Sequence, residues 1–375
     1  MFAKPKRIGK LEIKNRFVRS ATYEGRAAED GKITDELIDF YKTLSEGGSG
    51  LIITSYAFIQ HSGRANNKQI GVYEDNLIQG LQRLANTVHE YGEGCKVVLQ
   101  LVHAGRQSHY VKDTIAPSAV LEKFFNKMPR EMTIEEIEET IENFAQATRR
   151  AKEAGFDGVQ LHGAHGYLIS EFLSPYTNKR TDHYGGNTKN RVRFVEQIYR
   201  RSRELVGDEF PILIKMNCDD FLEGGIDLEE SKKITKILSD IGYDAIEISS
   251  CMWETVKRTK QEIGWKPTFI PESRMSIGSI NEPAYHLPYA KEIKKAINIP
   301  LILVGGVNSI DLIEEVLNNG DADFVAFSRP LIREPDLPNR WLKGIGSSTV
   351  DCDYCNSCLM TLAKSGIYCP KVKEP

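Results

Sequence analysis

Two histidines and a tyrosine stand close together in the middle of the chain, where they could act on one small ligand. The segment Phe156–Tyr167 reads Phe-Asp-Gly-Val-Gln-Leu-His-Gly-Ala-His-Gly-Tyr. It opens as a short, mostly apolar strand and ends in a glycine-rich turn that carries His162, His165 and Tyr167. A single buried histidine is more often a hydrogen-bonded structural residue than a catalytic one. Three polar rings in so short a turn favour a ligand that needs several hydrogen-bond donors.

The strands and helices around this turn decide what its side chains can reach. Eight short, mostly apolar segments are expected to form strands: Arg16–Ala21, Gly50–Ala57, Lys96–Val102, Gly158–Leu161, Pro211–Met216, Ala245–Ser249, Pro300–Val304 and Phe324–Phe327. Helical patterns lie between them, as at Asp35–Leu44, Thr133–Ala154 and Asp227–Leu238. This alternation predicts an α/β fold, a (β/α)8 TIM barrel with a short C-terminal cysteine-rich extension. A doubly wound open sheet is the alternative, but no Gly-x-Gly-x-x-Gly follows the first strand.

On a barrel, polar residues at the C-terminal ends of the strands form the functional face. Gly305 and Gly306 follow the seventh predicted strand, and Ser328 and Arg329 follow the eighth, where such barrels bind phosphate. Glycine lets backbone N–H groups approach a ligand closely, and a guanidinium can bind phosphate through two nitrogens. A glycine pair is equally common in an ordinary turn, so this feature alone does not settle the ligand.

Composition and charge exclude several classes of function. The 375 residues are 41% hydrophobic, the net charge is -3, and no long basic run exists, which argues against nucleic acid as a partner. The N-terminus has no apolar signal core, and no apolar run is long enough to span a bilayer. We expect a soluble, cytoplasmic homo-oligomer with a small-molecule substrate and no membrane partner.

Four of the seven cysteines lie in the last 24 residues, in a C-x2-C-x2-C-x10-C pattern formed by Cys352, Cys355, Cys358 and Cys369. Three closely spaced thiolates and a distant fourth before a proline recur in iron–sulfur proteins, and four thiolates commonly hold a [4Fe-4S] cluster. A four-cysteine zinc site and plain reduced thiols are the alternatives.

Several motifs, in order between about Leu11 and Pro338, resemble those of the old yellow enzyme family of FMN-dependent NADH:flavin oxidoreductases. They are Asn15-Arg-Phe-Val18, Gln100-Leu-Val-His-Ala-Gly-Arg106, His162-Gly-Ala-His-Gly-Tyr167, Phe172-Leu-Ser-Pro175, Tyr184-Gly-Gly186, Gly305-Gly-Val307 and Ser328-Arg-Pro330. The resemblance implies an FMN-binding barrel over residues 1–345 and a candidate iron–sulfur tail over residues 346–375.

By position, the resemblance also implies which residues contact FMN. Ser20, Ala21, Thr22 and Tyr23 would contact the isoalloxazine ring, Tyr56 would add a backbone contact, and Gln100 would bind the pyrimidine ring. Lys215 sits where the family places a cation that stabilises the reduced flavin. The phosphate would be held by Gly305, Gly306, Ser328 and Arg329.

In the same family, the pair matching His162 and His165 binds the carbonyl oxygen of an α,β-unsaturated substrate, and the tyrosine matching Tyr167 supplies a proton. This implies an ene-reductase in which hydride passes from the flavin N5 to the substrate, with NADH or NADPH as reductant. The alternative is an FMN/iron–sulfur amine dehydrogenase or demethylase, although two N–H donors suit an oxyanion better than a cation.

The cysteine tail resembles that of the branch containing trimethylamine dehydrogenase and bacterial dienoyl-CoA reductase. In that branch a domain that binds FAD or nicotinamide follows the cluster. Because the sequence ends at Pro375, we expect a separate electron-donor protein or direct hydride transfer from NAD(P)H.

Overall fold

Eight parallel strands form a closed barrel. The computed structural model describes residues 1–279, 281–363 and 365–372, so residues 364 and 373–375 of the predicted tail lie outside the described part. The barrel strands pair in the order β10-β11-β12-β3-β4-β5-β8-β9. Their bounds are Phe17–Arg19 (β3), Leu51–Phe58 (β4), Lys96–Val102 (β5), Gly158–Gly163 (β8), Ile212–Asn217 (β9), Ala245–Ser249 (β10), Leu301–Val304 (β11) and Phe324–Phe327 (β12). The predicted (β/α)8 barrel and its eight strands are confirmed.

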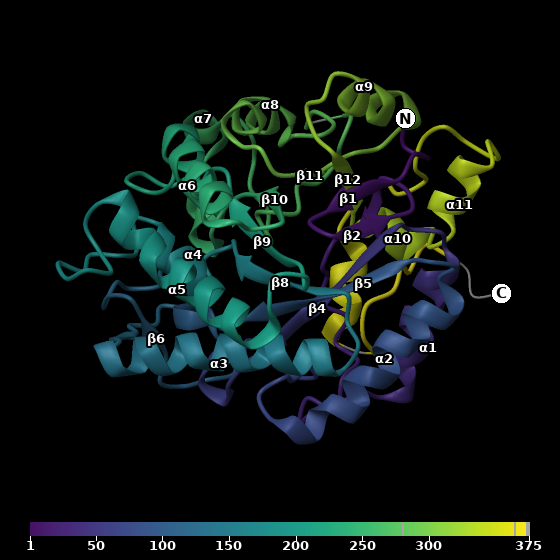
Figure 1. The fold of residues 1–375 in the computed structure, drawn as a ribbon. Coiled ribbons are helices and arrows are strands. Elements are labelled where there is room, and N and C mark those ends of the chain that lie inside the picture. Colours follow the sequence, from purple (N-terminus) through teal and green to yellow (C-terminus); the bar gives the residue numbers. More distant parts are fainter. Residues whose placement is uncertain (280, 364, 373–375) are drawn as a thin grey trace.

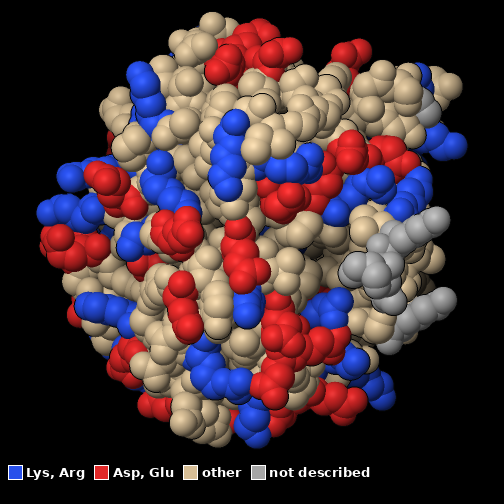
Figure 2. Space-filling model, turned by 90° about the vertical axis from the view of Figure 1, so that its right-hand side faces the viewer, with Lys and Arg blue, Asp and Glu red and all other residues tan. Residues whose placement is uncertain are grey.

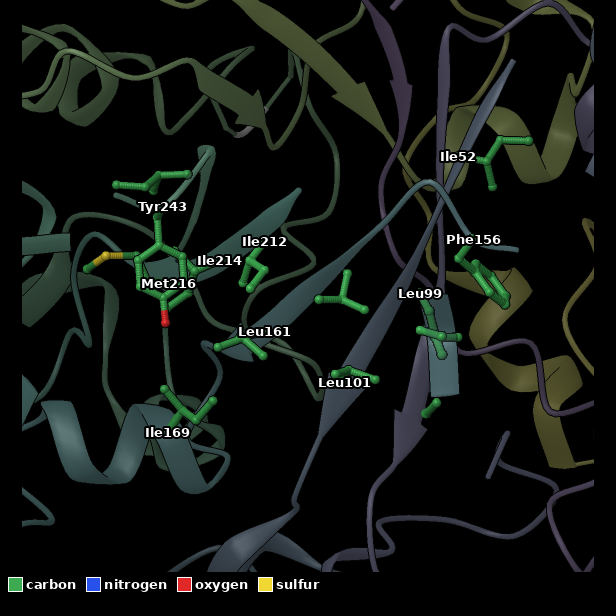
Figure 3. Packing of buried hydrophobic residues seen from close by; sticks show 14 of the residues in the cluster. Ile52, Leu99, Leu101, Phe156, Leu161, Ile169, Ile212, Ile214, Met216 and Tyr243 are labelled. Atoms are coloured by element: carbon green, nitrogen blue, oxygen red, sulfur yellow. The ribbon is translucent and has the colours of Figure 1, made fainter. Parts of the chain in front are cut away.

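The two-residue period of the strands sorts their side chains between the barrel interior and the helices. Outward side chains such as Ile52, Leu99, Leu161 and Ile214 belong to a large apolar layer against the helices (Figure 3). Inward side chains near the N-terminal ends of the strands are also apolar, and form a second cluster with members such as Val98. Nearer the C-terminal ends of the strands the inward side chains are polar, as at Gln100, Gln160 and Glu247, and this is the end at which such barrels bind ligands.

A short hairpin plugs the N-terminal end of the barrel. Strands β1 (Lys6–Ile8) and β2 (Leu11–Ile13) pair antiparallel. Ile8 and Ile13 are fully buried and pack into the inner apolar cluster. Three-residue strands are too short for sequence periodicity to reveal them.

Helices surround the barrel (Figure 1). The main ones are α1 (Asp35–Glu46), α2 (Ile78–Tyr91), α3 (Ile134–Glu153), α5 (Thr188–Val206), α6 (Leu228–Ile241), α8 (Leu287–Ala296) and α9 (Ile310–Asn318). Thr133 and Glu136 form the capping box that begins α3, which satisfies N–H groups at the helix start. Asp227 caps α6 in a similar way, through its side chain.

Shorter elements decorate the loops and the C-terminal region. They are β6 (Ile115–Ala116), β7 (Arg130–Glu131), α4 (Leu168–Leu173), α7 (Lys260–Ile263), α10 (Arg329–Arg333), α11 (Leu337–Leu342) and a 3₁₀ helix at Ser357–Ala363. On the face shown in Figure 2, acidic and basic side chains are interspersed. This matches the near balance of 49 Lys and Arg against 52 Asp and Glu.

Candidate active site

One cavity of about 560 Å³ is lined by residues at the C-terminal ends of the barrel strands. Every residue predicted to be catalytic or to contact FMN lines it: Ser20, Ala21, Thr22, Tyr23, Tyr56, Gln100, His162, His165, Tyr167, Lys215, Gly305, Gly306, Ser328 and Arg329. Closure of the barrel explains this convergence, because it brings the ends of distant strands to one rim. The roles of these residues stay predictions; the structure shows that they share one site.

A hydrogen-bonded layer of polar side chains crosses the barrel interior below the cavity. Gln100 Nε2 donates to Gln160 Oε1 at 2.7 Å, and Gln160 Nε2 donates to Glu247 Oε2 at 2.8 Å. Glu247 Oε1 lies 3.2 Å from Lys215 Nζ and accepts from Ser20 Oγ at 2.6 Å. Lys215 Nζ also lies 3.0 Å from Ser20 Oγ. Ser20, Gln100 and Lys215, three of the residues predicted to contact the flavin, are therefore held by one continuous network.

Sequence reasoning missed two members of this layer, Gln160 and Glu247. Both occupy inward positions of otherwise apolar strands, and both are fully buried. A charged residue within Ala-Ile-Glu-Ile-Ser is a usable signal, since buried carboxylates need a partner. The pattern alone does not identify that partner, which depends on strand register.

The imidazoles of His162 and His165 lie together, with ring centroids 5.0 Å apart. Burial, with a smaller contribution from the nearby Lys215 charge, holds the pKa of His162 well below its usual range. Burial also lowers the pKa of His165, assisted by His162 and Lys215. Both rings are therefore neutral near pH 7, each with one N–H donor and one acceptor nitrogen.

Neighbouring groups contact one nitrogen of each ring. The backbone N–H of Ala164 donates to His162 Nδ1 at 3.4 Å, which leaves the hydrogen on Nε2. His165 Nε2 lies 2.7 Å from Ser249 Oγ, a hydroxyl that can either donate or accept. With Ser249 as the donor, each ring keeps one N–H that a ligand oxygen can use.

The backbone around His165 adopts an uncommon conformation that a buried amide supports. His165 has φ of 62° and Cys251 has φ of 77°, and residues other than glycine rarely adopt such positive φ angles. Asn217 Oδ1 accepts from the His165 N–H at 3.1 Å, and Asn217 Nδ2 donates to the Cys251 carbonyl at 2.8 Å. Asn217, at the end of β9, therefore holds both strained residues in place.

Tyr167 lies beside the imidazoles, and its ring centroid is 4.9 Å from that of His162. Burial raises the pKa of its phenol well above the usual range, so the hydroxyl keeps its proton at neutral pH. Tyr56 was expected to contribute only backbone, but its ring lies 5.8 Å from Tyr167 and 5.6 Å from Tyr23. Its side chain is therefore a wall of the site.

The predicted phosphate end is a glycine cradle next to a buried arginine. Gly305 and Gly306 have φ of 113° and 76°. A Cβ added at Gly305 would lie 2.7 Å from His286 Nδ1, so only glycine fits there. Arg329 Nη1 donates to Asn356 Oδ1 at 2.6 Å, and its guanidinium lies over the Tyr354 ring.

The cysteine tail folds back onto the barrel and forms part of the cavity wall through Tyr354, Leu359, Met360, Leu362 and Ala363. Cys358 is buried, and Cys352, Cys355 and Cys369 are partly exposed free thiols. Within the described residues, no group of three or more His, Cys, Asp or Glu side chains has an arrangement that could hold a metal ion. The iron–sulfur cluster therefore stays a prediction.

Among the described residues, no helix is long and apolar enough to cross a membrane.

The family described as "NADH:flavin oxidoreductase / NADH oxidase family" matches residues 1–347. An NADH oxidase of Thermoanaerobacter brockii is 39% identical over 355 residues, which cover 93% of this chain and 52% of that protein. A solved 2-naphthoyl-CoA reductase complex matches with a TM-score of 0.88 at 29% identity, covering 98% of this chain and 56% of its own.

The old yellow enzyme homologue from Zymomonas mobilis matches with a TM-score of 0.76 at 26% identity, over 94% of this chain and 96% of that one. The chain spans about half the length of the curated relatives it matches. It belongs to the NADH:flavin oxidoreductase / NADH oxidase family and has the barrel of the old yellow enzymes.

Proposed function

We propose that this protein binds FMN and reduces the C=C bond of an α,β-unsaturated carbonyl compound. The observation that carries the proposal is the convergence of two neutral imidazoles and a protonated phenol in one buried pocket. These groups supply the donors that a carbonyl oxygen and the adjacent carbon need during reduction.

The residues present fit FMN. The Gly305–Gly306 cradle has no room for a Cβ, and Arg329 beside it supplies a cation suited to phosphate. Lys215 supplies a second buried cation in the same cavity. When bound, FMN would supply the hydride chemistry, recharged by NADH or NADPH.

The paired imidazoles would bind the substrate carbonyl oxygen. Each neutral ring offers one N–H, and two donors aimed at one oxygen withdraw electron density from the conjugated alkene. The β-carbon then becomes the electrophilic position. Because Ser249 and the Ala164 N–H hold the other ring nitrogens, neither ring needs to change its tautomer when substrate binds.

Tyr167 would protonate the α-carbon of the same substrate. Its hydroxyl lies in the cavity wall beside His162 and stays protonated because burial raises the pKa of the phenol. A positioned acid of this kind typically contributes about 10²-fold to 10⁴-fold in rate.

The amine dehydrogenase alternative requires the same pocket to hold a cationic or tertiary amine. Neutral N–H donors offer such a substrate no counter-charge, and the buried Glu247 carboxylate is already paired with Lys215. We therefore place ene reduction first.

We also propose that Cys352, Cys355, Cys358 and Cys369 hold a [4Fe-4S] cluster. The support is their spacing and the position of the tail in the cavity wall. The division into a barrel of residues 1–345 and a tail, a homo-oligomeric state and a separate electron-donor protein are further parts of this proposal.

Anaerobic half-reactions test the central proposal. FMN-loaded protein is reduced with NADH or NADPH and then mixed with cyclohex-2-enone, while flavin absorbance and saturated product are measured. We expect reoxidation with formation of cyclohexanone, and Tyr167→Phe should slow this step about 10²-fold while Tyr91→Phe, at the far end of α2, should not. Ene reduction would be rejected if a panel of enones failed to reoxidise the flavin, or if tertiary amines reduced the flavin.

A further inference from the structure

Five aromatic side chains from two connecting segments meet at the mouth of the cavity: His109, Phe124, Phe125, Trp253 and Phe269. We call them the aromatic cluster. His109, Phe124 and Phe125 lie between β5 and α3, and Trp253 and Phe269 lie between β10 and α8. Adjacent ring centroids lie 4.1 to 6.1 Å apart, mostly in edge-to-face contacts. Such spacing is that of a packed aromatic surface.

The cluster is open to the ligand on one side. His109, Trp253 and Phe269 line the cavity. Phe269 is 64% exposed, and none of the five side chains is buried. An aromatic surface that faces both a cavity and solvent marks a place where a partner molecule covers apolar area.

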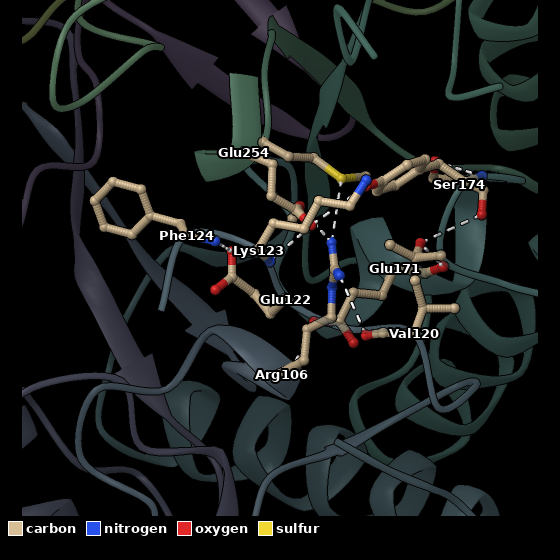
Figure 4. A network of polar contacts seen from close by, with 12 residues as sticks. Arg106, Val120, Glu122, Lys123, Phe124, Glu171, Ser174 and Glu254 are labelled. Atoms are coloured by element: carbon tan, nitrogen blue, oxygen red, sulfur yellow. Dashed lines mark hydrogen bonds and ion pairs between the residues drawn. The ribbon is translucent and has the colours of Figure 1, made fainter. Parts of the chain in front are cut away.

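A buried ion pair joins the β5–α3 segment to the β10–α8 segment, the two segments that carry the cluster (Figure 4). Arg106 Nη2 lies 2.6 Å from Glu254 Oε2, and both side chains are almost fully buried. Glu254 follows Trp253 directly. Arg106 Nη1 also donates to the Leu121 carbonyl at 3.1 Å, three residues before Phe124.

A second carboxylate fixes the phenylalanine pair. The backbone N–H groups of Phe124 and Phe125 donate to the two oxygens of Glu122 at 3.0 and 2.5 Å. Lys123 N–H donates to Glu254 Oε1 at 3.3 Å. The aromatic side chains are therefore held on braced loops, and less freedom is lost when a ligand covers them.

We propose that the aromatic cluster binds a planar aromatic arm of the substrate, so that the substrate class is a conjugated carbonyl compound bearing an aryl or fused-ring group. This inference rests on the proposed ene reduction at the same cavity. Carbon dominates the surface: only the His109 imidazole and the Trp253 indole carry a polar atom. The edges of a polar heterocycle such as adenine would find few hydrogen-bond partners on this surface.

A pair of enones with one reacting group tests the subsite. Wild-type FMN-loaded enzyme and the Trp253→Leu and Phe269→Leu variants are assayed with 4-(2-naphthyl)but-3-en-2-one and pent-3-en-2-one. We expect kcat/KM of the wild type to favour the naphthyl compound, and each variant to reduce that preference by about threefold to tenfold, the range for one lost aromatic contact. The control Tyr91→Leu, at the C-terminal end of α2, should leave the preference unchanged.

Binding without turnover separates the subsite from the chemistry. The saturated ketone 4-(2-naphthyl)butan-2-one should quench protein fluorescence, with a Kd that rises by a similar factor in Phe269→Leu, a variant that keeps Trp253. If no enone is reduced but this binding is seen, ene reduction fails and the subsite stands. An unchanged enone preference and an unchanged Kd overturn the subsite. A raised KM for NADH with an unchanged enone preference would assign the cluster to the coenzyme and also overturn it.

Discussion

At the scale of single residues, the floor of the cavity sets the charge beside a bound flavin. Lys215 and Glu247 form an ion pair with N···O 3.2 Å, and the Glu247 side chain is inaccessible to solvent. The carboxylate, rather than water, therefore balances the ammonium group. The two groups have opposite effects on a reduced flavin, because the cation stabilises its negative charge and the carboxylate opposes it.

Glu247→Gln should therefore raise the two-electron midpoint potential of bound FMN, and Lys215→Met should lower it. A change of roughly 30 mV corresponds to about 1.4 kcal/mol, the scale expected for neutralising one buried charge. Dye-equilibrated anaerobic titration measures the potential. Glu209→Gln serves as control, since Glu209 is 75% exposed and pairs only with Lys10 on the surface. Identical potentials in all variants with full FMN occupancy would contradict this role.

The same residues make a prediction about pH. Burial lowers the pKa of His162 and His165 and raises that of Tyr167. The imidazoles gain a proton only below their usual range and the phenol loses one only above it, so the catalytic protonation state persists between. As far as these three groups determine it, enone-dependent reoxidation should be nearly constant from about pH 6 to about pH 9. Glu272 lines the same cavity, and burial raises the pKa of its carboxyl to about 7, so the pH profile is measured in Glu272→Gln as well. A rate that rises or falls through about pH 6.5 in both proteins would show that one imidazole titrates normally.

At the scale of elements, the Arg106–Glu254 pair joins loops that lie far apart in the sequence. Arg106 follows β5, and Glu254 lies in the segment after β10. Glu171, in α4, accepts from the Arg106 backbone N–H at 2.9 Å, and burial raises the pKa of its carboxyl well above the usual range. The Arg106 guanidinium thus lies in a region with several buried carboxyl groups and forms an ion pair with one of them, Glu254.

Arg106→Met should destabilise the protein by about 3–5 kcal/mol, because the Glu254 carboxylate would remain buried without its cationic partner. Urea unfolding of FMN-free protein measures this. Lys236→Met is the matched control, since its i,i+4 pair with Asp240 is exposed and is worth about 0.3–0.5 kcal/mol. Adding Glu254→Leu to Arg106→Met should recover part of the lost stability. A cost below about 1 kcal/mol for Arg106→Met would show that the pair does not brace these loops.

Elements with local signals could be predicted from the sequence. Short apolar strands alternate with helices such as α3, which begins at a capping box, and this alternation predicts the barrel. His162 and Lys215 could be identified because they lie at the C-terminal ends of predicted strands. The aromatic cluster could not be predicted, because Phe125 and Trp253 meet only through the arrangement of two loops. Contacts between segments distant in sequence depend on tertiary packing, which periodicity does not report.

At the scale of the whole molecule, the cysteine tail packs against the cavity at the C-terminal ends of the barrel strands. Ile367 N–H donates to the Glu24 carbonyl at 2.8 Å, and Asn356 Nδ2 donates to the Ser273 carbonyl at 2.9 Å. Asn356 also accepts from Arg329, the predicted phosphate ligand. The segment between the third and fourth cysteines of the predicted cluster therefore borders the cavity through Leu362 and Ala363.

If the tail holds a [4Fe-4S] cluster, protein isolated without oxygen should contain about four iron atoms and about four acid-labile sulfides per chain. Cys358→Ser should remove most of both, because Cys358 is the buried thiol of the four and its loss leaves three ligands. Cys95→Ser is the control, since Cys95 is also buried but lies next to β5 at the opposite end of the barrel. About one zinc per chain without sulfide would support the structural-site alternative. The absence of both metals from anaerobic wild-type protein would reject the cluster and leave the FMN proposal unaffected, since the cradle at Gly305 and Arg329 does not involve these thiols.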